Sequence, residues 1–366
     1  MVTAVEGSPR HSHAVRRVAP GLSWALRLAL LAGLAYLLLV RMPLDNPFAP
    51  IYADAAIYAI VGLSLNILIG YTGQLSLGHN GFFGIGAFSA AYALTVREVP
   101  FAITFVVAAT CGALFALVMG VVALRITGLY LALITLVFGI TLENSLFEVS
   151  WLTNAGAGQP ANRPSWLYSE TRFFYFCLAF LLVALYLDYT LLRTKTGRAL
   201  LALKENERVA EAFGINVTAY KLLAFVLSGS LAGIAGALYA YRIGIVTASG
   251  LGFNLALLFV LLTVVGGLGS RVGVMLGALL FASLEFVLHE TWMHHVNDWV
   301  FRWDSAPQFA VGFIGALGLL LTIVLNPGGI GQQVRPLTRW LGGGRFTLHD
   351  DEGSGPAAVE GSSVRA

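Results

Sequence analysis

The polar side chains that could bind a small solute are concentrated in one glycine-rich stretch of an otherwise apolar sequence. This stretch, residues 70–86, reads GYTGQLSLGHNGFFGIG. Amide, hydroxyl and imidazole groups can hydrogen-bond a polar solute at membrane depth, where an unpaired polar group is costly. With one residue that precedes the stretch, the candidates for lining a translocation path are Asn66, Gln74, Ser76, His79 and Asn80.

Two structural interpretations of this stretch remain open from the sequence. Irregular backbone at membrane depth is tolerated only against protein or along a water-filled path, so the stretch could be a broken helix that lines a solute route. It could equally be an inner-side turn that leads into an ordinary helix packed through small residues. His79 by itself is more typical of a hydrogen bond between helices than of a ligand or a proton carrier.

Carboxylates inside apolar segments are a second source of candidate chemistry. Glu143 and Glu285 lie within such segments, and Asp54 and Asp188 lie near the ends of others. A charge at the bilayer centre costs about 2.5–3.5 kcal/mol or more, which makes such a residue a default functional candidate. Both glutamates are about a turn from a predicted helix end and could reach the interface. Glu143 is nevertheless added to the translocation-path candidates.

The sequence indicates neither a catalytic nor a metal site. It contains no phosphate-binding G-x-x-x-x-G-K-[S/T] loop, no nucleophile-elbow pattern and no Cys/His cluster with metal-ligand spacing. His289 and Glu290 followed by His294 suggest a metalloprotease motif. Histidines five residues apart, however, do not share a helical face as that motif requires. An enzyme is therefore not expected, and no cofactor is expected in this chain.

The elements that must position these side chains are membrane-spanning helices. Of 366 residues, 57% are hydrophobic and only 11% are charged, against roughly 25% charged in soluble domains. The formal net charge of +3, without a basic cluster among aromatics, argues against nucleic acid as a partner. We predict an all-α polytopic membrane protein with about ten spans, of which the third and eighth are the weakest. The spans are expected at 22–40, 53–70, 75–95, 101–123, 128–147, 173–192, 220–242, 254–268, 270–289 and 307–325.

Basic residues predict the orientation of the spans. With the N-terminus in the cytoplasm, most of the 22 lysines and arginines fall on the inner side, as the positive-inside rule requires. Both termini of the chain are therefore expected in the cytoplasm. The expected organisation is a cytoplasmic N-terminal segment at 1–20, a transmembrane domain at 21–330 and a cytoplasmic, disordered tail at 331–366.

The longest inner-side loop, about 193–219, has the composition of short helices. Opposite charges lie three residues apart, in the pairs Lys204 with Glu207, Glu205 with Arg208, and Arg208 with Glu211, so that they would share a helical face. Gly214 can adopt the left-handed conformation that ends a helix. The residues alone leave two interpretations open, a solvated connector and a short helix that docks onto a cytoplasmic partner.

Several separated patches together resemble the LivM-like permease subunits of bacterial branched-chain amino acid ABC importers. The resemblance covers about residues 50 to 332, and its patches follow the family's order. The first patches are 70–79, 82–87, 129–136 and 196–200. The later ones are 211–217, 220–222, 232–238, 266–270, 277–278 and 327–330.

The resemblance implies a type II-like ABC importer permease that works by alternating access. Glu211, Ala212 and Gly214 match the loop by which such permeases engage their ATPases, so the docking interpretation of 193–219 becomes the stronger one. The implied partners are a homologous second permease, two cytoplasmic ATPase subunits that bind ATP and Mg, a periplasmic solute-binding protein and the lipid of the bacterial inner membrane. The candidate ATPase-coupling residues are Arg198, Glu205, Glu207, Arg208, Glu211, Ala212 and Gly214.

One outer loop departs from the family pattern and bears on the identity of the solute. Where the family usually has a Thr-Gly-Gly-x-x-Gly-like outer loop, residues 153–158 read TNAGAG, and this loop would face the binding protein. Branched-chain amino acids are the leading expectation, and urea, short amides or other amino acids are the alternatives. From another class, a stand-alone ion-coupled carrier or channel is disfavoured by the ATPase-coupling loop and by the scarcity of intramembrane carboxylates.

Overall fold

The computed structural model describes residues 48–126, 128–153 and 157–290, with 317, 329–332 and 334; side chains are not described for 284–290. All of these residues belong to one compact unit, Leu44–Ala366. The predicted first span, the tenth span apart from single positions, the N-terminal segment, the tail beyond 334 and His294 lie outside the described residues.

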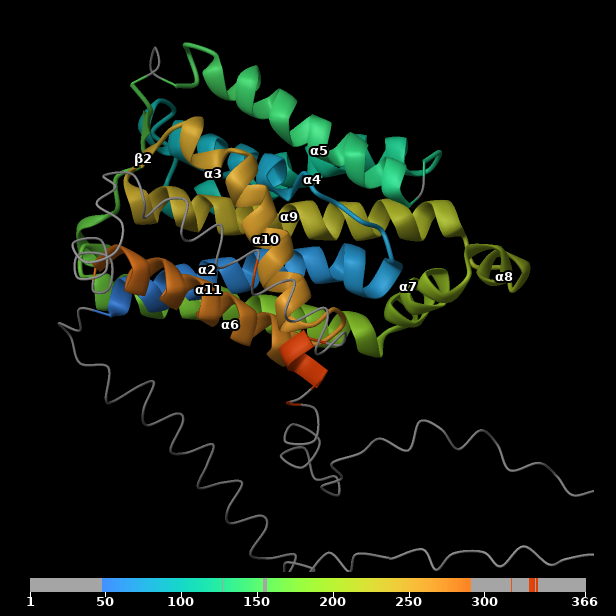
Figure 1. Cartoon of the computed structure of the whole chain (residues 1–366). Coiled ribbons are helices and arrows are strands. Elements are labelled where there is room, and N and C mark those ends of the chain that lie inside the picture. Colours follow the sequence, from blue (N-terminus) through green and yellow to red (C-terminus); the bar gives the residue numbers. More distant parts are fainter. Residues whose placement is uncertain are drawn as a thin grey trace, which may run out of the picture. The chain divides into compact units, whose positions relative to one another are not determined.

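The described part of the chain is built almost entirely of helices (Figure 1). The long elements are α2 (Ala49–Leu65) with η1 (Asn66–Gly70), α3 (His79–Thr95), α4 (Phe101–Ala123), α5 (Leu129–Asn144), α6 (Glu170–Arg193), α9 (Val217–Ile243), α10 (Phe253–Gly266) and α11 (Arg271–Glu290). The short helices are α7 (Lys195–Glu205), α8 (Glu207–Ala212), η2 (Leu146–Glu148), η3 (Ser165–Leu167) and η4 (Ser249–Leu251).

The predicted all-α polytopic class is confirmed. In the described ranges, six helical segments are long and apolar enough to cross a membrane, and each coincides with a predicted span. Helix α3 has 17 residues and starts four positions later than the predicted third span, because residues 73–78 are not helical. The fourth predicted span, 101–123, matches α4 without a shift.

Helix α2 lies at the centre of the bundle. Its apolar window is 94% buried, because it packs against α6, α9, α10 and α11. Helix α9 lies between α2 on one side and α3 and α4 on the other (Figure 1). A helix that is apolar on all faces is expected in the interior of such an assembly.

Glycines allow α9 to approach its neighbours closely. A Cβ on Gly236 would meet the Phe83 carbonyl group of α3, and one on Gly233 would meet the Ala108 carbonyl group of α4. Small residues at such positions let transmembrane helix backbones come into direct contact.

One end of the bundle carries α7 and α8, and the other carries a short strand pair. β1 (Gln159–Pro160) pairs antiparallel with β2 (Ile245–Val246), and the Ala161 amide donates to the Gly244 carbonyl at 2.7 Å. The sequence did not predict this pair, because each strand is only two residues long and its partner lies far along the chain.

Candidate functional site

The glycine-rich stretch contains a non-helical break between two helices. After η1, residues 73–78 are non-helical, and Gly73 has a φ of 71°. A Cβ on Gly78 would overlap the Thr135 carbonyl oxygen of α5, so the break packs directly on that helix. The Leu77 amide donates to Thr135 Oγ1 at 3.0 Å. The helix is therefore broken, as the first interpretation expected, and it also packs through glycine, as the second expected.

His79 joins α3 to α9 through a chain of buried hydroxyl groups. Ser228 Oγ donates to the Ser64 carbonyl oxygen at 2.7 Å. Since that bond uses the only hydroxyl proton of Ser228, Ser228 Oγ accepts from His79 Nε2, which lies 2.8 Å away. His79 Nδ1 then accepts from Ser76 Oγ at 3.0 Å. Both ring nitrogens thus take part in a buried hydrogen-bond network that joins α3 to α9.

Replacing Ser228 by alanine is expected to destabilise the protein by about 1–3 kcal/mol, because the buried His79 Nε2–H loses its acceptor. The measurement is the free energy of unfolding in mixed detergent micelles. Ser230→Ala is the matched control, since among the described residues Ser230 Oγ bonds to the Leu227 carbonyl of its own helix. It is expected to change stability by less than about 0.5 kcal/mol. Equal stability of the two variants would contradict the assigned network.

Gln74, in the same break, has buried polar atoms without partners among the described residues. It is 6% exposed, and among the described residues neither its Oε1 nor its Nε2 has a hydrogen-bond partner. Such a side chain has full capacity to bind a polar group that enters the bundle.

Asn80 and Glu143 both lie against the turn that precedes α10. Asn80 Nδ2 donates to the Leu251 carbonyl at 3.1 Å, and Asn80 Oδ1 is buried without a partner among the described residues. The Glu143 carboxylate lies against Gly252, where a Cβ would come within 2.6 Å of Oε1. The structure therefore brings Ser76 and His79 together in one place and Asn80 and Glu143 together in another.

Asn66 belongs to a separate network at the end of the bundle that carries α7. It lies at the start of the π-helical turn η1, and its Oδ1 accepts from the Gly269 amide at 2.7 Å. Its Nδ2 donates to the Tyr71 hydroxyl at 3.0 Å. The Tyr71 hydroxyl donates in turn to Asp188 Oδ2 at 3.1 Å.

Arg271 and Asp188 complete this network and were not among the predicted site residues. Arg271 Nε forms an ion pair with Asp188 Oδ2, and its NH2 donates to the Asp188 carbonyl at 3.3 Å. The Asp188 side chain is fully buried and the Arg271 side chain is 28% exposed. In the sequence, Asp188 is visible as a carboxylate near the end of an apolar segment, but the sequence does not identify its partner, Arg271, which lies 83 residues later.

The predicted coupling loop forms two helices rather than one. Asn206 interrupts them, and its Oδ1 caps α8 by accepting from the amides of Arg208 and Val209. Two of the three predicted charge pairs, Lys204 with Glu207 and Glu205 with Arg208, span this break. The prediction that each pair shares one helical face is therefore wrong for these two.

Glu207 instead forms an ion pair with a lysine in the first turns of α9. Lys221 Nζ lies 2.7 Å from Glu207 Oε2, and the Lys221 side chain is only 4% exposed. The loop end is as predicted, since Gly214 has a φ of 80°. Among the other predicted coupling residues, Arg198, Glu205, Arg208, Glu211 and Ala212 are all exposed.

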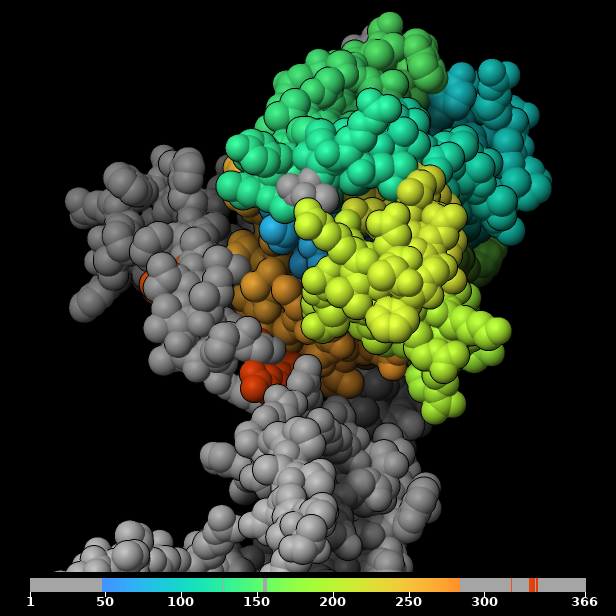
Figure 2. Space-filling view, turned by 90° about the vertical axis from the view of Figure 1, so that its right-hand side faces the viewer, coloured from blue at the N-terminus to red at the C-terminus, as the bar shows by residue number. Residues whose placement is uncertain are grey.

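Exposed apolar side chains surround these charges at the tip of the loop. Phe213 is 83% exposed and Val209 is 50% exposed. Figure 2 looks onto this end, where the yellow-green helices project beside the green surface of α5. Phe213 and Val209 thus leave apolar surface exposed at the tip of the loop.

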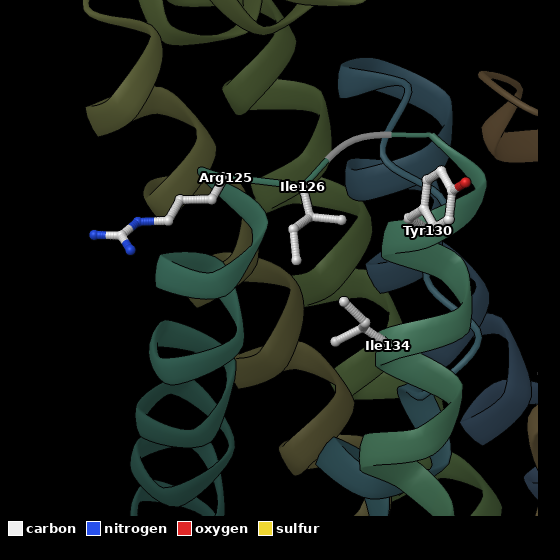
Figure 3. A pocket seen from close by; sticks show the side chains of 4 residues that line it. All are labelled: Arg125, Ile126, Tyr130 and Ile134. Carbon is white, nitrogen blue, oxygen red and sulfur yellow. The ribbon is translucent and has the colours of Figure 1, made fainter.

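A pocket opens between α4 and α5. Its volume is about 430 Å³, and it is lined by Arg125, Ile126, Tyr130 and Ile134. In Figure 3, Ile126 and Ile134 point toward one another, whereas the Arg125 side chain extends away from them. Within the described ranges, no three His, Cys, Asp or Glu side chains are grouped so that they could hold a metal ion.

Comparisons with known proteins place this arrangement in a family. The family described as "Branched-chain amino acid transport system / permease component" matches residues 48–322. The high-affinity branched-chain amino acid transport permease LivM of Escherichia coli K12 is 29% identical over 308 residues, covering 76% of this chain and 69% of LivM.

More distant relatives transport other solutes. The autoinducer 2 import permease LsrC of Enterobacter sp. 638 is 32% identical over 44% of each chain. The nucleoside ABC transporter permease NupC of Lactococcus lactis is 36% identical over 28% of this chain and 32% of NupC. No solved structure matches the chain. The chain is a multi-pass membrane protein and belongs to the family of ABC transporter permeases described as the branched-chain amino acid transport system permease component.

Proposed function

We propose that this chain is the permease subunit of an ATP-driven importer that moves branched-chain amino acids across the bacterial inner membrane by alternating access. The observation that carries the proposal is the α7–α8 loop, which presents Phe213, Val209 and exposed charges at one end of the bundle. We assign this end to the cytoplasm, where most basic residues fall. Its partners are two ATPase subunits, a homologous second permease and a periplasmic solute-binding protein.

The solute would pass near the break at 73–78. Discontinuous helices in transporters expose polar backbone and side-chain groups where solute binds. Here Gln74 has a free amide, and Asn80 has a free Oδ1 among the described residues. Branched-chain amino acids are favoured because LivM shows the more extensive match, 76% of this chain, whereas the LsrC and NupC matches cover less than half of it.

Phe213→Ser is expected to reduce the ATPase subunit that co-purifies with this chain by about tenfold or more. An exposed aromatic anchor at an interface contributes about 2 kcal/mol or more to binding. The measurement is the ratio of ATPase to permease after affinity purification of the complete complex from detergent.

Phe253→Ser is the matched control, because Phe253 is also exposed, at 40%, but begins α10 at the other end of the bundle. It is expected to leave the ratio unchanged. A wild-type complex that assembles with no ATPase would overturn the importer proposal. Stimulation of the assembled complex by a binding protein loaded with leucine, rather than with a nucleoside or an amide, would identify the solute.

A further inference from the structure

Side chains from two other helices bond to the turn between α10 and α11 and to the residue that follows it. This turn, residues 267–270, contains two glycines with positive φ, Gly267 at 110° and Gly269 at 79°. The Gly269 amide donates to Asn66 Oδ1 at 2.7 Å. Arg271, the first residue of α11, forms the ion pair with Asp188 of α6. The turn is therefore attached both to η1, which continues α2, and to α6.

A single hydroxyl group joins these two attachments. The Tyr71 hydroxyl accepts from Asn66 Nδ2 at 3.0 Å and donates to Asp188 Oδ2 at 3.1 Å. Asn66 and Tyr71 are buried, at 0% and 2% exposed, and Asp188 is 1% exposed. Inside a protein such charge-assisted bonds are strong and keep a specific geometry.

Asp188 also lies immediately before the coupling helices. Helix α6 ends at Arg193, about one and a half turns beyond Asp188. Only Thr194 separates α6 from α7. The two helices are in close contact at this connection, because a Cβ on Gly197 of α7 would come within 2.9 Å of the Leu192 carbonyl carbon of α6. A displacement of α7 must therefore move the inner end of α6, and Asp188 with it.

We propose that Asp188 and Arg271, joined by Tyr71 to Asn66, are positioning residues that transmit movement of the coupling helices to the α10–α11 turn. The network acts as a strut between α6 and α11, both of which pack on the central helix α2. This inference rests on the proposed function, since it assigns the route by which ATPase movement reaches the bundle. None of these residues needs to contact the solute or ATP.

The test is the number of solute molecules taken up per ATP hydrolysed by the complete complex in proteoliposomes. Asp188→Asn is expected to lower this ratio about tenfold, within the 5- to 150-fold range typical of coupling between sites. ATP hydrolysis by the variant should continue. Tyr71→Phe removes only the bridging hydroxyl group and is expected to lower the ratio about threefold, the effect of one hydrogen bond.

Asp188→Asn leaves Arg271 without its charge partner and could prevent folding. The double variant Asp188→Asn/Arg271→Gln removes both charges together, and it is expected to fold and to show the same tenfold loss of coupling. Glu170→Gln is the matched control, since Glu170 forms an ion pair with Arg163 at the opposite end of the bundle, at 2.8 Å. It is expected to leave the ratio unchanged.

The outcomes separate this inference from the proposed function. A wild-type complex that shows ATP-dependent uptake, with a ratio unchanged in Tyr71→Phe and in the double variant, would overturn the strut and leave the importer intact. A wild-type complex that takes up no solute in response to ATP would overturn the importer itself. A tenfold lower ratio in the double variant, with ATP hydrolysis maintained and Glu170→Gln unaffected, is the result that supports the strut.

Discussion

Gly236→Ala is expected to destabilise the protein by about 3 kcal/mol or more, the upper range for overpacking of a tight core. The added Cβ would overlap the Phe83 carbonyl oxygen and lie 2.9 Å from the Ala87 amide nitrogen. Since these are backbone atoms of α3, no side-chain rotation can relieve the overlap. Helices α3 and α9 must separate, and the contact between α9 and α4 through Gly233 is strained as well.

The measurement is the free energy of unfolding in mixed micelles, with the yield of monodisperse protein after extraction. Gly250→Ala is the control, because the one described atom that a Cβ there would approach is Thr247 Oγ1, at 3.4 Å. It is expected to change stability by less than about 0.5 kcal/mol. If the two alanine variants were equally stable, the direct backbone packing of α3 on α9 would be wrong.

Arg163→Gln is expected to cost about 3 kcal/mol and to release the strand pair at the end of the bundle opposite α7. Arg163 donates to the carbonyls of Tyr241 and Arg242, at 2.5 and 2.8 Å, and pairs with Glu170. These carbonyls belong to the last turn of α9, where helical carbonyls have no intrahelical partner. The cost is kept at the lower end for a broken buried pair because Glu170 is 40% exposed.

Hydrogen–deuterium exchange measures this release directly. The Ala161 amide, bonded to the Gly244 carbonyl at 2.7 Å, should exchange markedly faster in Arg163→Gln than in the wild type. Arg172→Gln is the control, because Arg172 is exposed and, within the described part of the chain, makes a 3.5 Å contact with the Trp166 carbonyl. Unchanged exchange at Ala161 in Arg163→Gln would show that other contacts hold the strand pair.

Span positions could be predicted well because the signal for them is local. A run of about twenty apolar residues is long enough to cross a bilayer wherever it packs, and α4 and α6 illustrate this. The predicted third span, 75–95, is the exception, because its first four residues lie in the non-helical break. Gly78, the last residue of that break, lies against Thr135 of α5, far along the chain, which leaves no room for a side chain there.

The ion pairs of the coupling loop were predicted poorly, because which charges meet depends on the direction that the chain takes after the break between α7 and α8. The spacing of Lys204 and Glu207 suggested neighbours on one helix, but the Asn206 cap redirects the chain. Glu207 then meets Lys221, fourteen residues later. Asparagine is a strong helix N-cap, so this break was in principle readable from the sequence, whereas the choice of Lys221 as partner was not.

The sequence by itself determined the membrane class, most helix boundaries, the family and the glycine that ends the coupling loop, because composition and local backbone preference control these features. Only the tertiary structure decided which polar groups meet. His79 binds Ser228, Asp188 binds Arg271 and Arg163 binds the end of α9, all across long sequence separations. Buried polar groups must find partners, and the packing of glycine-lined helices selects which partners come within reach.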